Sequence, residues 1–169
     1  PPEAEPINLA RTFDNGRLRW EEYRVWKDRE IHRLGTAEFA AYYVTRTILA
    51  PAPRRVRVYL GCDDSITVWL NGKQIHSHLV GHWCAPDQEI VDLDLKAGEN
   101  PLLVKITNGV LDAAFYFSLR PHNASGDALT PLWEQLARDF PASAQQIGWV
   151  REDRIFADGK DRPEWAAIG

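Results

Sequence analysis

The sequence predicts an all-β fold, in which a β-sandwich forms the main body and a short helical extension follows at the C-terminus. From Ile7 to Leu119, short runs of β-branched and aromatic residues alternate with polar residues. Turn residues interrupt these runs about every ten positions, which is typical of a sandwich or barrel. The pattern changes after Pro121. We therefore expect a sandwich domain over residues 1–122, and a helical extension with a tail over residues 123–169 that packs on it.

Strands are clearest in the second half of the sandwich. Alternating apolar residues predict strands at 55–60, 66–70, 74–79, 90–95, 102–107 and 114–119, and longer strands at 18–26 and 39–49. Two prolines at Ala50-Pro51-Ala52-Pro53 stop the strand at 39–49. Asn71-Gly72 predicts a two-residue hairpin turn with positive φ angles, and Gly98 and Asn100 are expected to supply them in the next turn.

The C-terminal extension carries two helix signals. Thr130 is a good N-cap residue, and Pro131 suits the first helical position that follows it. Ser143 and Gln146 have the spacing of a capping box for a second short helix. Residues 151–169 show no clear period, so we expect an extended tail that is anchored by a few aromatic side chains.

Composition and charge narrow the classes of partner. The chain has 169 residues, of which 44% are hydrophobic, enough for one sizeable core. Its 20 basic and 24 acidic residues give a net charge of −4 without a basic stripe, so no nucleic acid is expected as a partner. No apolar run reaches the roughly 18 residues of a membrane-spanning helix, so no membrane insertion is expected. The chain begins with Pro1 and lacks methionine, which leads us to expect a processed form or a piece of a longer protein.

Two blocks of sequence carry a resemblance to a known superfold. They are YLGCDDSITVWLNGK at residues 59–73 and LKAGENPLLVKITNG at residues 95–109. Their turns and spacing resemble those of galactose-binding-like jelly rolls, such as the sugar-binding domains of β-galactosidase-type and β-glucuronidase-type glycosidases. The chain resembles more closely the accessory sandwich domains of large secreted bacterial proteins that carry a c-type cytochrome domain. In those proteins the sandwich is also followed by a Leu-Trp-Glu helix and an Arg-Glu-Asp stretch, here Leu132-Trp133-Glu134 and Arg151-Glu152-Asp153.

The resemblance implies a function as well as a fold. It implies a jelly-roll sandwich that serves as a carbohydrate-binding accessory module and binds a glycan weakly at its edge. It also implies a secreted, periplasmic or cell-surface bacterial location. The alternative is a structural or docking module that positions neighbouring domains of a parent protein and has no small-molecule ligand.

Catalytic motifs are not found in the sequence. It contains no Gly-x-Ser-x-Gly elbow, no phosphate-binding glycine loop, no His-Glu-x-x-His motif and no Cys-x-x-Cys-His haem attachment site. We therefore expect that the chain is not an enzyme.

Trp83 is the leading candidate for contact with a glycan. It lies in the expected loop Gly81-His82-Trp83, and loops carry binding residues more often than regular elements do. An exposed indole can stack on the apolar face of a pyranose. We expect His78, His82 and Asp112 to form hydrogen bonds with the hydroxyl groups of the sugar. The alternative reading of Trp83 is an aromatic anchor of the loop itself.

Metal sites and a disulfide are further hypotheses. Asp63 and Asp64 could ligate a structural calcium ion, although turn aspartates often bind their own backbone instead. His76, His78 and His82 could form a zinc site with Cys84, or they could be ordinary solvent-facing histidines. Cys62 and Cys84 could instead form a disulfide, which would exclude Cys84 as a ligand.

Overall fold

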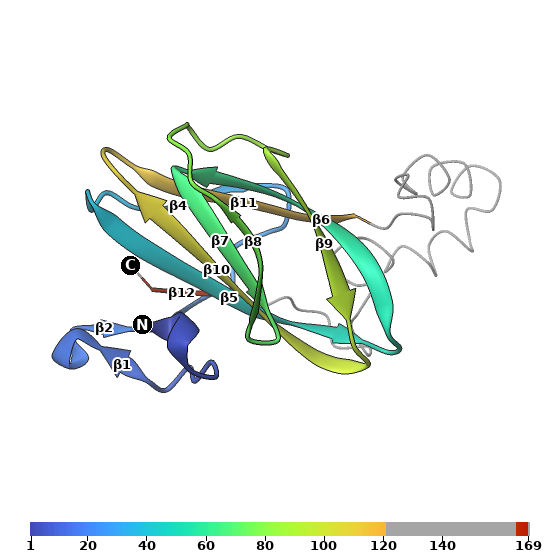
Figure 1. Cartoon of the computed structure of the whole chain (residues 1–169). Coiled ribbons are helices and arrows are strands. Elements are labelled where there is room, and N and C mark those ends of the chain that lie inside the picture. The colour runs from blue at the N-terminus through green and yellow to red at the C-terminus, as the bar shows by residue number, and fades with distance from the viewer. Residues whose placement is uncertain (121–164, 169) are drawn as a thin grey trace.

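The computed structural model describes residues 1–120 and 165–168. Two antiparallel sheets face each other (Figure 1), which confirms the predicted all-β sandwich. The larger sheet has the order β3 (Glu21–Tyr23), β12 (Trp165–Ile168), β5 (Ala40–Ala50), β10 (Gly98–Asn108), β7 (Ser65–Leu70) and β8 (Lys73–His78). The smaller sheet has the order β4 (Ile31–Gly35), β11 (Ala113–Arg120), β6 (Arg54–Asp63) and β9 (Glu89–Leu95).

Most of the predicted strands are confirmed. The runs from residue 55 to 119 form β6 to β11, and the run at 39–49 forms β5, which ends at Ala50 before the two prolines. The run at 18–26 is divided into β2 (Leu18–Arg19) and β3. The sequence did not predict β4 or β12, and the helices expected from Thr130 and Ser143 lie outside the described residues. Among the described residues, no helix has the length and hydropathy needed to cross a membrane.

The last strand joins the N-terminal part of the chain to the larger sheet. β12 lies between β3 and β5, where Ala166 pairs with Glu22 on one side and with Thr45 on the other. Residues 165–168 therefore belong to the sheet of the sandwich itself, whereas the sequence analysis assigned them to the C-terminal extension.

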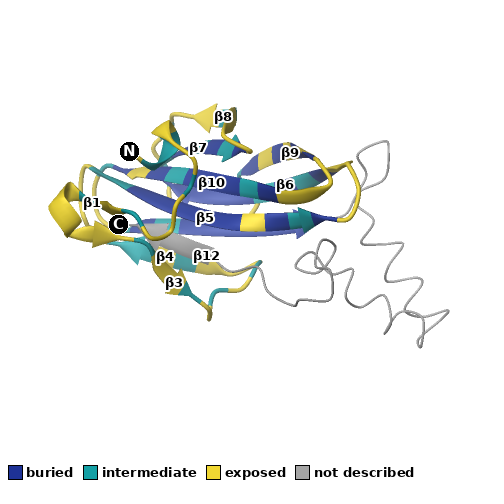
Figure 2. Ribbon diagram, turned by 90° about the horizontal axis from the view of Figure 1, so that it is seen from below, coloured by how far each residue is buried: buried dark blue, intermediate teal, exposed yellow. Residues whose placement is uncertain are grey.

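The hydrophobic core lies between the two sheets. Burial alternates along β7 and β9, as expected for strands with one face against a core. Figure 2 shows the buried positions along the central strands of the larger sheet. The largest fully buried side chains come from both sheets: Phe115, Phe117, Leu60, Ile66, Leu93, Leu102, Ile106 and Leu119. Removal of their apolar surface from water is the main favourable contribution to folding.

β5 and β10 form the longest strand pair of the structure. They pair without a break from Gly98 opposite Ala50 to Asn108 opposite Ala40. Asn100 and Asn108 are fully buried near the two ends of β10. The carboxamide of Asn100 donates to Lys96 O at 2.8 Å and to Gly98 O at 2.9 Å, and accepts the Lys96 N–H at 3.0 Å.

The turn before β10 therefore differs from the prediction. Gly98 has the expected positive φ of 86°, but Asn100 is not among the residues with positive φ. Asn100 lies in β10 and organises the turn through its side chain. The hairpin turn at Asn71-Gly72 has positive φ at both residues, as predicted.

The N-terminal segment covers the outer face of the larger sheet. There Tyr43 and Leu103 are buried under Ile7, Phe13 and Trp20, and Trp69 packs in the same cluster. β1 (Thr12–Phe13) pairs with β2, and the short 3-10 helices η1 (Pro2–Ala4) and η2 (Asp14–Gly16) belong to the same segment. Figure 1 shows this segment beside the larger sheet.

A buried ion pair lies between the connection from β3 to β4 and strand β5. Arg46 Nη1 contacts both carboxylate oxygens of Asp28, at 2.9 and 3.1 Å, and the two side chains are only 4% and 6% exposed. The Arg46 guanidinium also lies 4.8 Å from the centre of the Phe117 ring. Arg46 thus links the N-terminal connection, β5 of the larger sheet and β11 of the smaller sheet.

Replacement of Asp28 by alanine should leave the Arg46 charge buried without this partner. We expect Asp28→Ala to lower the free energy of unfolding by about 3–5 kcal/mol in urea titration. Asp94→Ala is the matched control, because Asp94 pairs with Arg55 on the surface, where the two side chains are 72% and 61% exposed. Asp94→Ala should lower the free energy of unfolding by at most about 1 kcal/mol. Equal losses in the two variants would contradict this role of the buried pair.

Candidate functional site

The candidate binding loop is the connection between β8 and β9, residues 79–88. It lies directly against β6, since a Cβ atom on Gly61 would come within 2.0 Å of Ala85 O. Gln88 holds the loop in place. Its Oε1 accepts the N–H groups of Cys62 at 3.2 Å and of Ala85 at 3.0 Å, and its Nε2 donates to Trp83 O at 2.6 Å. The loop therefore has a defined path although it carries few regular backbone pairs.

Three of the four predicted ligand residues meet on this loop and the adjoining strand. The side chain of Trp83 is 72% exposed, although its backbone carbonyl is held by Gln88. His82 Nδ1 lies 3.1 Å from Gln88 Nε2, and the His82 and His78 ring centres are 6.5 Å apart. The structure thus places the exposed Trp83 on the same loop as His82, whose ring approaches that of His78 on β8.

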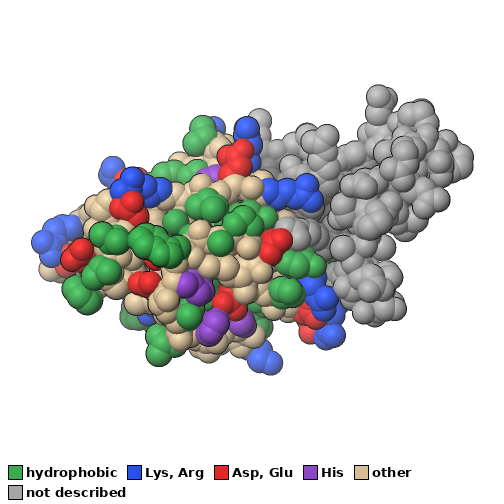
Figure 3. All heavy atoms as spheres, turned by 90° about the horizontal axis from the view of Figure 1, so that it is seen from above, with side chains coloured by type: hydrophobic (Ala, Val, Ile, Leu, Met, Phe, Trp, Pro, Cys, Tyr) green, Lys and Arg blue, Asp and Glu red, His purple; other side chains and the backbone are tan. Residues whose placement is uncertain are grey.

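Glu89 is a central residue of the site that the sequence analysis missed. Its carboxylate is buried and contacts His78 Nδ1 at 2.5 Å and His76 Nε2 at 2.9 Å. Figure 3 shows histidine side chains grouped beside an acidic side chain on this face. Burial acts to raise the pKa of Glu89, but the contacts from His78 and His76 outweigh it and hold the pKa below its usual value.

The signal for Glu89 was present in the strand pattern. Glu89 has the same parity as Val91, Leu93 and Leu95, all of which are buried. An acidic residue on the buried face of a strand needs polar partners. His76 and His78, in the strand predicted at residues 74–79, could have been identified as those partners.

Asp112 lies on the loop between β10 and β11 and forms an ion pair with Arg33. This loop and the candidate loop both approach Asp64: the Gly109 N–H donates to Asp64 Oδ2 at 2.7 Å, and a Cβ atom on Gly81 would lie 3.8 Å from Asp64 Oδ1. The Asp112 side chain is 48% exposed. It is therefore accessible from solvent, but one of its oxygens is already engaged.

The described residues contain no group of three or more His, Cys, Asp or Glu side chains placed to hold a metal ion. The histidines and Cys84 of the predicted zinc set are therefore not gathered at one point, whereas the calcium site at the two residues Asp63 and Asp64 stays a prediction. Asp64 Oδ2 accepts the Gly109 N–H at 2.7 Å. Burial and the neighbouring Asp64 raise the pKa of Asp63, although the Cys84 backbone acts to lower it.

The three histidines of the predicted zinc site each have a side-chain partner within the protein. His76 and His78 direct ring nitrogens at Glu89, and His82 directs Nδ1 at Gln88. Cys62 and Cys84 are free thiols in the structure and do not form the predicted disulfide. Burial raises the pKa of both thiols to about 12, so neither is a thiolate at neutral pH.

The histidine contacts make stability depend on the ionisation of Glu89. The pKa of Glu89 in the folded protein lies below its ordinary value of 4.5, so its contribution to stability is present above pH 4.5 and is lost as the pH falls through the folded pKa. We expect the urea midpoint to fall more steeply between about pH 5 and pH 3 in the natural chain than in Glu89→Gln. Two curves that stay parallel over this range would contradict the assignment.

Comparisons with known proteins do not place the chain in a family. No protein-family model matches it, and no curated protein matches it. The resemblance to galactose-binding-like modules therefore remains a prediction from the sequence blocks at residues 59–73 and 95–109.

Proposed function

We propose that this chain is a non-catalytic carbohydrate-binding module of a larger secreted bacterial protein, and that it binds a glycan weakly through the loop at residues 79–88. The observation that carries the proposal is the 72% exposure of Trp83 on a loop whose backbone is held by hydrogen bonds. A large aromatic side chain exposed to water contributes little to folding, because it buries little surface. Its apolar face is available to a ligand.

The surroundings of Trp83 suit a sugar. A pyranose offers an apolar face of C–H groups and a rim of hydroxyl groups, so it needs an aromatic surface and nearby polar groups. His78 is half exposed, and its ring is oriented by the contact with Glu89. Asp112 on the neighbouring loop adds an accessible carboxylate. Because these groups are positioned before binding, little conformational entropy is lost when a ligand binds.

The small contact area accounts for weak binding. One exposed ring and two or three polar side chains give an expected Kd between about 1 mM and 1 μM. The interaction would therefore gain strength from several modules or several glycan chains acting together.

The order of the strands supports the jelly-roll part of the proposal. Strands β4, β11, β6 and β9 form one sheet, and β5, β10, β7 and β8 lie adjacent in the other. Along the chain from β4 to β11, each strand lies in the sheet opposite its predecessor, except at the β7–β8 hairpin. This order fits eight strands arranged as two Greek keys.

A docking function is the second candidate, and exposed apolar side chains on the loops favour it. Phe39 and Leu79 are 84% and 90% exposed, and Val110 and Leu111 are also more than half exposed. The loop of Phe39 is joined to that of Val110 and Leu111, since the Phe39 N–H donates to Gly109 O at 2.7 Å. Such a surface can bind a neighbouring domain.

Substitution of the exposed indole separates the two functions. We expect Trp83→Ala to weaken glycan binding at least about tenfold in isothermal titration, a loss of about 1.4 kcal/mol, because the stacking surface is removed. The fold should be unchanged because Trp83 is outside the core. Val25→Ala is the matched control, because Val25 is 79% exposed on the connection between β3 and β4. Equal glycan affinity in both variants would contradict the proposed site and favour docking.

A further inference from the structure

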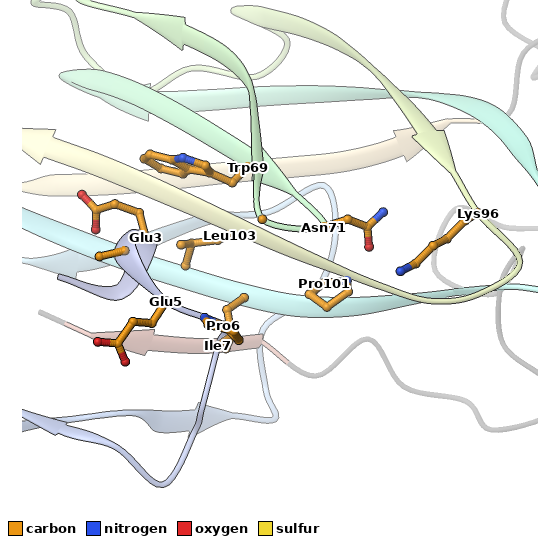
Figure 4. A pocket seen from close by; sticks show the side chains of 11 residues that line it. Glu3, Glu5, Pro6, Ile7, Trp69, Asn71, Lys96, Pro101 and Leu103 are labelled. Carbon is orange, nitrogen blue, oxygen red and sulfur yellow. The ribbon is translucent and has the colours of Figure 1, made fainter.

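A pocket of about 470 Å³ lies between the N-terminal segment and the outer face of the larger sheet. Figure 4 shows its lining: residues of the N-terminal segment on one side, Trp69 and Leu103 from β7 and β10, and Lys96 at the far end from Glu3. Pockets that hold small ligands are usually about 300–1,000 Å³ in volume. Val80 of the candidate loop is hydrogen-bonded to Ser65, at the end of β7 away from Trp69. The pocket is therefore a different site from the candidate loop.

The charges in the pocket favour an anionic ligand. Glu3 Oε1 accepts hydrogen bonds from Tyr43 Oη and Lys105 Nζ, each at 3.1 Å. Glu5 forms an ion pair with Arg11. Both carboxylates of the lining are therefore paired with cations. The Lys96 ammonium has no acceptor among residues 1–120 and 165–168, so it is the unpaired charge of this lining.

The remaining lining groups suit a hydroxylated ring. Trp69, Leu103 and Pro101 provide an apolar surface. The Trp69 indole N–H makes no hydrogen bond within the described part of the chain and is left as a donor. Asn71 donates from Nδ2 to Asn100 Oδ1 at 3.0 Å, which leaves Asn71 Oδ1 as an acceptor. The pocket thus combines an apolar surface with the Lys96 cation, the Trp69 donor and the Asn71 acceptor, and Glu3 Oε2, which is buried without a partner in the described chain, is a further acceptor at the end away from Lys96.

We propose that this pocket binds an acidic sugar residue, a uronic acid within a glycan chain. Its carboxylate pairs with Lys96, and its ring lies against Pro101 with a hydroxyl group on Asn71 Oδ1. The adjoining sugar of the glycan chain lies against Trp69 and its indole N–H, because Figure 4 shows Asn71 and Pro101 between Lys96 and Trp69. This inference rests on the carbohydrate-binding function proposed above, and it adds a second site with a defined sugar class. A phosphate ester fits less well, since a phosphate group accepts several hydrogen bonds and Lys96 is the one cation of the lining without an acidic partner in the described chain.

The test compares two trisaccharides with the same sugar backbone, one with charged carboxylates and one with neutral methyl esters. Trigalacturonate and its fully methyl-esterified form are titrated into ¹⁵N-labelled protein, and the indole N–H signals are followed by NMR. We expect the Trp69 signal to shift with trigalacturonate, and the affinity to be at least about fivefold higher than for the ester, because a charge-assisted hydrogen bond is lost in the ester. Equal affinity for both trisaccharides, or no shift at Trp69, would overturn the proposal.

The variant Lys96→Gln should lower the affinity for trigalacturonate at least about fivefold and leave the affinity for the ester unchanged. Lys73→Gln is the matched control, since Lys73 is an exposed lysine just beyond the same Asn71-Gly72 turn and is not part of the lining. Equal effects of the two variants would overturn the assignment of Lys96.

Trp83→Ala in the same titration separates this inference from the proposed loop site. If trigalacturonate binding is lost in Trp83→Ala and unchanged in Lys96→Gln, the pocket proposal fails while the loop site stands. If binding depends on Lys96 and shifts Trp69, while no neutral glycan responds to Trp83→Ala, the loop site fails and the pocket stands.

Discussion

The continuous pairing of β5 with β10 determines where both candidate sites lie. Each strand has one face in the core, so their functional groups can stand only on the outer face or on the loops at the two ends. Near one end of β10, Asn100 organises the turn that carries Lys96. At the other end, Asn108 donates to Ala37 O at 2.9 Å and Leu111 O at 3.1 Å, which ties together the loops beside the candidate site. Two buried amide side chains thus position the surroundings of both sites.

The smaller sheet shows how a buried polar group can orient exposed ones. Glu89 begins β9 on the face that points inward, where a carboxylate without partners would be strongly disfavoured. His76 and His78 satisfy it from the neighbouring sheet. The requirement to pair this charge fixes the orientation of His78, whose ring is half exposed beside the loop of Trp83. One carboxylate therefore serves both the packing of the core and the orientation of the exposed His78 ring.

Period-two patterns predicted the sandwich well, because β6 to β11 bury one face each. These patterns did not predict the strands that lack a regular alternation of buried and exposed residues. β4 is partly exposed along its length, and the residues of β12, Trp-Ala-Ala-Ile, show no alternation of apolar and polar types. Pairing with β3 and β5 makes residues 165–168 a strand, and such long-range contacts leave no local signal.

The candidate sites were predictable to different degrees. Loop composition was enough to suggest that Trp83 is exposed, which the structure confirms. The pocket depends on Ile7 and Glu3 folding back over Trp69, contacts between residues more than sixty positions apart. Trp69 alternates with buried Val68 and Leu70, so its outward direction follows from the pattern, but what covers it does not.

Glycan-array screening of the chain, with Ca²⁺ and again with EDTA, tests the central claim most directly. The account predicts binding to a restricted set of glycans that EDTA does not change, because the carboxylates and imidazoles near Trp83 are engaged with protein groups and not arranged around an ion. An array without binding under both conditions would contradict a carbohydrate-binding function. Binding that requires Ca²⁺ would contradict the metal-independent site described for this loop.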